Sequence, residues 1–318
     1  MSILVLGSNG LVGSAVCRRL KQDERNFVAA SRKDFDLMNF ESTSDYFKKV
    51  KPRTIIGAAA KVGGMIANKT YPVEFLIENL AMQNNMMLAA FINNVEKVIF
   101  LGSSCIYPAK AEQPIPESAL LTGKLETSNE AYAVAKIAGI KLIQSFRDEY
   151  DKKWISVMPT NLYGPGDNFD LNNSHVLAAF IRKFYEALRA KQNNLKFWGS
   201  GLPRREFMHV DDFAEALIHV QDNYDGRDLI NIGTGADISI KELSLLMKNI
   251  SGFAGDISWD TNYPDGTYQK LLDVTKLNSL GWKARIPLED GLASTYEWFS
   301  NNYNSSRLNV PIANQTER

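Results

Sequence analysis

Residues 7–13 are Gly7-Ser8-Asn9-Gly10-Leu11-Val12-Gly13, which gives the spacing G-x-x-G-x-x-G. They follow a short apolar run, Ile3–Leu6, and open a segment with apolar residues at helical spacing, Gly10–Lys21. Glycines between a strand and a helix allow a tight turn. They also let backbone N–H groups approach a pyrophosphate, which the helix N-terminus attracts. The motif therefore predicts a Rossmann-type dinucleotide-binding turn.

The first half of the chain alternates apolar runs with longer helical patterns. The expected strands are Ile3–Leu6, Phe27–Ala30, Thr54–Ala60, Val98–Leu101 and Trp154–Met158. The expected helices are Gly10–Lys21, Ser42–Val50, Pro72–Asn94 and Glu130–Tyr150. Strands separated by helices of this length pair in parallel through right-handed crossovers. The predicted fold class is α/β, with a Rossmann-type doubly wound parallel sheet.

The pattern changes after Pro159. Asn161–Asn173 is rich in Gly, Pro, Asn and Asp and is expected to be a loop, and Phe197–Phe207 is expected to form turns around short strands. The remaining expected elements are helices at Ser174–Lys191, Asp211–Asp222, Ile240–Ile250 and Leu288–Phe299 and a strand at Asp228–Ile232. This pattern indicates a smaller C-terminal α/β substrate domain, with the chain crossing between the domains more than once. The expected division is residues 1–160 plus about 209–234 for the dinucleotide, about 161–208 plus 235–305 for the substrate, and a tail at 306–318.

Composition limits the class of protein. The 318 residues carry 36 Lys and Arg against 36 Asp and Glu, a formal net charge of +0, which gives no electrostatic case for binding nucleic acid. No apolar run approaches the roughly 18 residues of a membrane helix. Two cysteines, Cys17 and Cys105, do not make a disulfide framework, and no cluster of His and Cys indicates a metal site. The first residues lack a basic region ahead of the glycine turn, so we expect a cytoplasmic protein.

Arg32 is the first strongly polar side chain after the second expected strand. At this position an acidic residue binds the ribose 2′-OH of NAD, whereas an arginine suits the 2′-phosphate of NADP. Asp34 and Asp36 are close by in the sequence and could weaken that preference. The sequence therefore favours NADP(H) as the cofactor.

Tyr132 and Lys136 form a Y-x-x-x-K pair on one face of an expected helix. A Tyr with a pKa near ~10 is a poor acid or base at neutral pH, and a neighbouring ammonium is expected to lower that pKa. Such a pair can exchange a proton with a carbonyl oxygen while hydride moves at carbon. Ser103 follows the fourth expected strand and can place a hydroxyl beside the Tyr.

The glycine motif, the Ser103 after the fourth strand and the Tyr132–Lys136 pair together resemble the extended short-chain dehydrogenase/reductases. Those enzymes act largely on nucleotide sugars. The chain is also similar, from about Ile3 to about Phe299, to one family among them, the GDP-L-fucose synthases. The matching segments are Ala58–Gly64, Gly102–Pro108, Met158–Pro165, Asn173–Val176, Trp198–Gly201, Arg205–Phe207 and His209–Asp212. The resemblance implies a 3,5-epimerisation of GDP-4-keto-6-deoxy-D-mannose followed by an NADPH-dependent 4-reduction.

The resemblance also implies the roles of individual residues. Cys105 and His175 would be the acid and base of the epimerisation, and Tyr132, Lys136 and Ser103 would serve the reduction. The implied cofactor contacts are Gly7, Ser8, Asn9, Gly10, Leu11, Val12, Gly13, Arg32, Ala59, Leu101, Gly102, Ser103, Lys136, Pro159, Thr160, Asn161, Leu162 and His175. The implied substrate contacts are Lys183, Trp198, Arg205 and Asp265.

Two positions depart from the family's usual pattern. Lys183 stands where relatives often carry Arg, and it would hold a phosphate as a point charge rather than a fork. Ser8-Asn9 stands where many relatives carry a basic residue, which leaves the choice of NADP more dependent on Arg32.

Three alternatives stay open at the level of the sequence. The chain could be a GDP-colitose-type synthase or another nucleotide-sugar 4-epimerase or 4-reductase, although a plain 4-epimerase has no use for both Cys105 and His175. It could also be a non-catalytic NADP-sensing protein, but such proteins typically lose the Tyr or Lys that this chain keeps. By analogy with relatives, the helices Pro72–Asn94 and Glu130–Tyr150 are expected to pair in a homodimer.

Overall fold

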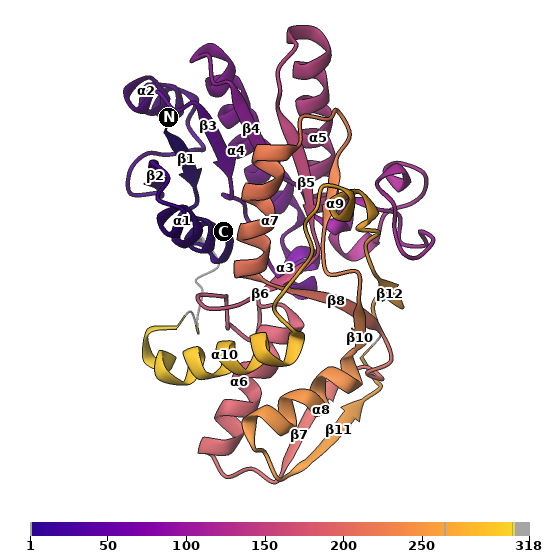
Figure 1. Cartoon of the computed structure of the whole chain (residues 1–318). Coiled ribbons are helices and arrows are strands. Elements are labelled where there is room, and N and C mark those ends of the chain that lie inside the picture. The colour runs from indigo at the N-terminus through magenta and orange to yellow at the C-terminus, as the bar shows by residue number, and fades with distance from the viewer. Residues whose placement is uncertain (1, 264, 307, 309–318) are drawn as a thin grey trace, which may run out of the picture.

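A six-stranded parallel sheet forms the centre of the upper part of the molecule (Figure 1). The structure is a computed structural model that describes residues 2–263, 265–306 and 308. In sheet order the strands are β2 (Phe27–Ala30), β1 (Ile3–Leu6), β3 (Thr54–Gly57), β4 (Lys97–Leu101), β5 (Ile155–Pro159) and β9 (Ile230–Ile232). The expected α/β fold with a doubly wound parallel sheet is confirmed.

The strand order reverses at β1. The chain passes from β1 to β2 on one side and returns to β3 on the other, with Leu6 in register with both Ala30 and Gly57. The glycine turn after Leu6 therefore lies at the switch point, where doubly wound sheets bind nucleotides.

Helices cover both faces of this sheet and bury two separate apolar layers. One face carries α1 (Leu11–Gln22), α7 (Val210–Asn223) and α9 (Thr275–Ser279). The other face carries α2 (Phe40–Val50), α4 (Pro72–Ile92) and α5 (Glu130–Tyr150). Ion pairs from Arg18 to Asp211 and from Arg19 to Glu215, both at 2.5 Å, join α1 to α7. No helix in the described part of the chain is long and apolar enough to cross a bilayer.

A second region, below the sheet in Figure 1, has its own aromatic-rich core. Its strands are β6 (Asn161–Tyr163), β7 (Asn194–Trp198), β8 (Arg204–His209), β10 (Asp237–Ser239), β11 (Asp256–Asp260) and β12 (Gln269–Lys270). Its helices are α6 (Val176–Arg189), α8 (Ile240–Ser251) and α10 (Leu288–Asn301). β8 is the central strand of the four-stranded sheet in this region, since β10, β12 and β6 all pair with it.

Several sequence expectations were wrong in detail. The stretch predicted as a loop from Asn161 begins with β6, which pairs in parallel with β8. Three residues are too few to show strand periodicity. The third strand ends at Gly57 rather than Ala60, because the Ala58 N–H turns back to the Ile56 carbonyl at 3.1 Å.

Short elements were missed. They are α3 (Met65–Thr70), α9, β10, β11, β12 and the 3-10 turns η1 (Ser104–Ile106), η2 (Glu117–Ala119), η3 (Thr127–Asn129) and η4 (Tyr303–Ser305). The predicted tail, 306–318, lies outside the described residues except for Ser306 and Leu308.

Glu206 on β8 connects the two sheets, and its side chain has no exposed surface. Its carboxylate accepts backbone N–H groups of Thr234 (2.6 Å) and Gly235 (2.8 Å), just after β9, and of Leu272 (3.0 Å), just after β12. Its own carbonyl accepts the Asn161 side-chain amide at 2.8 Å. A buried carboxylate held by three N–H donors fixes these segments relative to one another.

Candidate active site

The glycine turn has the geometry of a phosphate loop. Gly7 adopts φ +71°, a left-handed conformation that favours glycine. A side chain at Gly13 would overlap the Gly7 carbonyl oxygen, so α1 can start this close to β1 only with glycine there. Gly10 caps α1 with backbone alone, and the first turn has no acidic side chain. The N-terminus of α1 is therefore suited to an anion.

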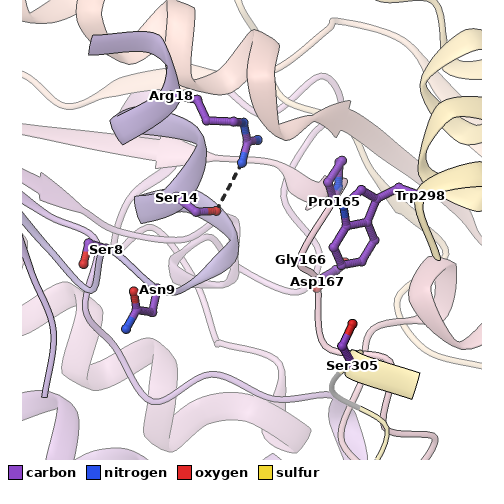
Figure 2. A pocket seen from close by; sticks show the side chains of 9 residues that line it. All are labelled: Ser8, Asn9, Ser14, Arg18, Pro165, Gly166, Asp167, Trp298 and Ser305. Carbon is purple, nitrogen blue, oxygen red and sulfur yellow. Dashed lines mark hydrogen bonds between the residues drawn. The ribbon is translucent and has the colours of Figure 1, made fainter. Parts of the chain in front are cut away.

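A hollow of about 390 Å³ adjoins this turn (Figure 2). Its lining residues are Ser8, Asn9, Ser14, Arg18, Pro165, Gly166, Asp167, Trp298 and Ser305. In Figure 2 the Arg18 guanidinium reaches back to the Ser14 hydroxyl, at 3.4 Å, while the Trp298 ring lies on the opposite side. The hollow leaves room next to the turn where a dinucleotide is expected.

Arg32 lies exposed at the end of β2, with no ion pair within the described residues. The neighbouring acids are turned to the backbone. Asp34 accepts the Ser31 N–H at 2.8 Å, and these bonds from Ser31 lower the pKa of Asp34. Asp36 accepts the Met38 N–H at 2.9 Å. Neither acid competes for the guanidinium that is expected to bind a 2′-phosphate.

Tyr132 and Lys136 lie next to each other on α5, as the spacing predicted. The Lys136 ammonium donates to the Leu101 carbonyl at 2.9 Å and lies 5.7 Å from the centre of the Tyr132 ring. Lys136 is 4% exposed, and burial lowers its pKa to about 8. The end of β4 therefore holds this lysine in place.

The structure contradicts the expected direction of the Tyr132 pKa. Burial, and to a smaller extent the neighbouring Cys105, raise the pKa of the phenol above its ordinary value. The Tyr132 ring packs edge-on against Phe75 at 6.2 Å. Such a phenol stays protonated at neutral pH, which suits a proton donor rather than a base.

Cys105 lies in η1, directly after β4. Its backbone N–H donates to the Ser103 hydroxyl at 3.4 Å, so Ser103 caps this turn. Burial raises the pKa of the thiol, whereas Lys270, Ser103 and Lys136 act in the opposite direction. Cys105, Ser103, Tyr132 and Lys136 thus form one cluster at the carboxyl end of β4.

His175 lies at the N-cap position of α6, makes no capping hydrogen bond with its side chain, and keeps exposed surface. The surrounding protein nevertheless lowers the pKa of its imidazole by removing it from bulk water. The loop before it is bound to the segment after β3, since the Gly64 N–H donates to the Asn173 carbonyl at 2.8 Å. No hydrogen bond within the described residues joins His175 to the Cys105 cluster.

The expected substrate residues lie on the second region. The Lys183 ammonium lies 5.3 Å from the Phe197 ring and 5.6 Å from the Trp198 ring, and burial lowers its pKa. Trp198 is 49% exposed and stacks on Tyr263, with ring centres 4.5 Å apart. This arrangement offers a cation beside an open aromatic surface.

The other two expected substrate residues, Arg205 and Asp265, differ from each other in their surroundings. Burial lowers the pKa of Arg205, which lies on β8, while Glu126 and Asp265 oppose that shift. Asp265 accepts the Ser200 N–H at 2.9 Å and the Ser200 hydroxyl at 2.6 Å. The Asp265 carboxylate therefore closes the turn after Trp198.

Sequence reasoning missed Lys270, Glu126 and Tyr263. Lys270 on β12 is coupled electrostatically to Cys105, Arg205 and Glu126. Only the pairing of β12 with β8 brings it there, and a two-residue strand leaves no periodicity to detect.

Residues 3–233 match the NAD dependent epimerase/dehydratase family. The chain is 51% identical to the putative GDP-L-fucose synthase 2 of Arabidopsis thaliana, over 94% of this chain and 92% of that protein. It is 46% identical to the GDP-L-fucose synthase of Escherichia coli (strain K12), over 96% of this chain and 98% of that protein. Among solved structures, a GDP-L-fucose synthetase from Naegleria fowleri bound to NADP has a TM-score of 0.89 and 32% identity, over 96% of this chain and 94% of that chain.

Proposed function

Because the chain belongs to the NAD dependent epimerase/dehydratase family and, within it, to the GDP-L-fucose synthases, we propose that it converts GDP-4-keto-6-deoxy-D-mannose to GDP-L-fucose with NADPH. The observation that carries this proposal is the cluster of Tyr132, Lys136, Ser103 and Cys105 beside a glycine turn that fits a dinucleotide. A thiol next to a Tyr–Lys pair supplies a second proton-transfer group, which a simple reductase does not need.

The first reaction is epimerisation at the two carbons beside the C4 ketone. Cys105 and His175 act from opposite faces of the sugar. One removes the proton from carbon, the C–H electron pair forms an enolate, and the other returns a proton to the opposite face. Burial lowers the pKa of His175 below its ordinary value, so its imidazolium gives up a proton more readily.

The second reaction is reduction at C4. NADPH, when bound, supplies the hydride that C4 accepts. Tyr132 donates a proton to the C4 oxygen, and its raised pKa keeps that proton available. Ser103 donates a hydrogen bond to the same oxygen, and Lys136, held by the Leu101 carbonyl, orients the cofactor ribose.

Cofactor binding rests on the glycine turn, with the pyrophosphate at the N-terminus of α1 and the 2′-phosphate at Arg32. The other cofactor contacts proposed are Ala59, Leu101, Gly102, Pro159, Thr160, Asn161, Leu162 and His175. Thr160 and Asn161 lie where β5 passes into β6, held to the Glu206 carbonyl. This part of the site is thus built from strand ends of the central sheet together with β6 of the second region.

The GDP end is held by the second region. Lys183 and Arg205 provide positive charge for the diphosphate, and Trp198 offers a face for stacking or sugar packing. We assign residues 1–160 with about 209–234 to the cofactor, and about 161–208 with 235–305 to the GDP-sugar. The separate aromatic core of the second region supports this division.

A homodimer is part of the proposal. Helix α4 keeps large apolar side chains exposed, including Val73 (66%), Ile77 (57%), Leu88 and Ile92, and Val134 is exposed on the adjacent α5. Exposed apolar side chains gathered on neighbouring helices are typical of a subunit interface.

The test is to incubate the protein with GDP-4-keto-6-deoxy-mannose and NADPH in deuterated water. We expect NADPH oxidation with deuterium at both C3 and C5. Cys105→Ser should lose the deuterium exchange, and Tyr132→Phe should lose mainly hydride transfer, by about 10²–10⁴-fold. Deuterium at C5 alone would favour a colitose-type enzyme, absence of turnover would contradict the proposed function, and exchange lost with Tyr132→Phe while reduction survives would reverse the assigned roles.

A further inference from the structure

Two glycines after β3, Gly63 and Gly64, contact the loop between β6 and α6 (residues 164–175), which ends in His175. The Gly64 N–H donates to the Asn173 carbonyl at 2.8 Å. A methyl group at Gly64 would lie 2.6 Å from the Ser174 carbonyl oxygen, too close to fit without a shift. Gly64 has φ −65°, which any residue adopts, so only this close contact disfavours a side chain. The backbones of the two regions therefore meet directly ahead of His175.

Asn68 on α3 fixes the two glycines. Its side-chain amide donates to the Gly63 carbonyl at 2.8 Å and to the Gly64 carbonyl at 3.1 Å, and the residue is 6% exposed. Helix α3 in turn packs against η3, the turn ahead of α5. Because a buried carbonyl that loses its donor is costly, these two bonds hold the glycines in one conformation.

The same segment is anchored on α4. Asn79, which is buried, accepts the Lys61 N–H at 3.0 Å and donates to the Lys61 carbonyl at 3.0 Å. The Lys61 ammonium pairs with Glu78 at 2.6 Å and also with Glu74. The chain that leads to the glycines is therefore tied to α4 by backbone and side chain alike.

Phe75 on α4 connects the glycines to Tyr132. A methyl group at Gly63 would lie 3.0 Å from the Phe75 ring, so this ring packs directly on the glycine. The Phe75 ring also packs edge-on against the Tyr132 ring, with ring centres 6.2 Å apart. One series of contacts thus runs from Tyr132 through Phe75 and the glycines to the backbone ahead of His175.

We propose that Asn68 and Gly64 are positioning residues for the epimerisation, which hold the loop of His175 against the cofactor region at a fixed spacing from Tyr132. The inference rests on the proposed function, in which His175 and Cys105 exchange protons with opposite faces of the sugar. Proton transfer to carbon requires the acid to lie within reach of the enolate. Hydride transfer at C4 does not use His175. Loosening the loop should therefore slow epimerisation and spare reduction.

The test uses two variants that act on this contact by different means. Asn68→Asp keeps the shape of the side chain but replaces the amide donor by an oxygen that faces two carbonyls. Gly64→Ala places a methyl group against the Ser174 carbonyl. Asn249→Asp, the same change at an exposed residue of α8, is the matched control.

The first measurement needs no substrate. It is amide hydrogen exchange followed by mass spectrometry of peptides. In Asn68→Asp and Gly64→Ala we expect exchange about tenfold faster in peptides covering residues 164–175, and no change in peptides from α5. Asn249→Asp should match wild type throughout.

The second measurement compares two rates. Deuterium exchange into GDP-4-keto-6-deoxy-mannose should slow about 10–100-fold in both variants, because a small displacement of the acid strongly slows proton transfer. Oxidation of GDP-L-fucose at saturating NADP⁺ reverses hydride transfer and needs no epimerisation, so its rate should stay within about twofold of wild type. A purely structural role would lower both rates together.

Three outcomes would overturn the inference. They are deuterium exchange into the sugar as fast as in wild type, an equal fall of both rates, and unchanged amide exchange in residues 164–175. If wild type turns over no GDP-keto-sugar but amide exchange in residues 164–175 still rises in both variants, the proposed function fails while the contact between Gly64 and the loop stands.

Discussion

At the residue scale, burial sets the acid–base behaviour of the site more than sequence spacing does. The Y-x-x-x-K spacing correctly placed Tyr132 and Lys136 together, but it led to the expectation of a lowered Tyr132 pKa. Removal from water raises the pKa of the phenol and lowers that of the ammonium. Since burial depends on which segments cover α5, spacing alone could not have given this direction.

Lys136 makes stability depend on pH in a defined window. Its pKa is lowered from 10.5 to about 8 in the folded protein. Between these values the unfolded chain binds a proton that the folded chain does not, so the free energy of unfolding rises with pH. We expect the stability of wild type relative to Lys136→Met to be flat below pH about 8 and to rise from there toward 10.5. Urea denaturation across this window measures it.

The control for this prediction is Lys141→Met, an exposed lysine on the same helix. It should show no such rise relative to wild type. A fall of wild-type stability relative to Lys136→Met over the same window would rule out the buried ammonium as the cause.

At the element scale, the contact between β1 and α1 depends on glycine at position 13. In Gly13→Ala the new methyl group meets the backbone of Gly7, which cannot rotate aside. Overpacking of this kind costs about 1–3 kcal/mol of unfolding free energy. Because the same shift displaces the N-terminus of α1, NADPH should also bind more weakly.

Denaturation and NADPH titration by fluorescence check the Gly13→Ala prediction. The exposed Lys21→Ala on the same helix should change neither measurement. If Gly13→Ala binds NADPH as tightly as wild type does, the proposed role of the glycine turn in cofactor binding is contradicted.

The strands and helices that could be predicted from the sequence were those whose own residues show an apolar pattern. The strands β1, β3, β4 and β5 are covered on both faces, so they appear as apolar runs. The helix Glu130–Tyr150 was placed with the bounds that the structure has. In the second region β10 and β12 have only three and two residues. Pairing with a strand distant in sequence holds them in place.

The same contrast between local patterns and distant pairing explains which residues of the candidate site could be predicted from the sequence. Ser103 and Cys105 belong to the turn after β4, and Tyr132 and Lys136 belong to α5; recognisable motifs identify both segments. Lys270, whose charge acts on the pKa of Cys105, is placed only by the pairing of β12 with β8. That pairing joins residues distant in sequence, and no local pattern reports it.

At the scale of the whole molecule, the free energy of unfolding should depend strongly on the side chain at Glu206. Glu206→Gln replaces one acceptor oxygen by an amide that faces N–H donors of Thr234, Gly235 or Leu272. An unsatisfied buried donor costs about 1–3 kcal/mol, so we expect the free energy of unfolding to fall by that amount. Urea denaturation measures it, with the exposed Glu130→Gln as a control. Equal stability of both variants would show that the carboxylate does not hold the sheets together.

The proposed dimer is testable through the exposed face of α4. Ile77→Glu places a charge among apolar side chains that a partner subunit would cover, so it should convert the dimer to a monomer of 35.6 kDa. Light scattering after size-exclusion chromatography gives the mass. Leu245→Glu changes a comparably exposed residue on α8 and should leave the mass as in wild type. A wild-type protein that is monomeric at high concentration would contradict the dimer.

The position of β9 affects the order in which the nascent chain can assemble. The first five strands of the central sheet are synthesised by Pro159, but the sixth, Ile230–Ile232, follows only after β6, β7, β8 and two long helices. Until then β5 presents an unpaired edge with apolar faces, the kind of edge that promotes aggregation. A ribosome stalled before residue 230 would therefore hold a sheet that exposes this edge, and β5 gains its second sheet partner only after β8 and α7 have been made.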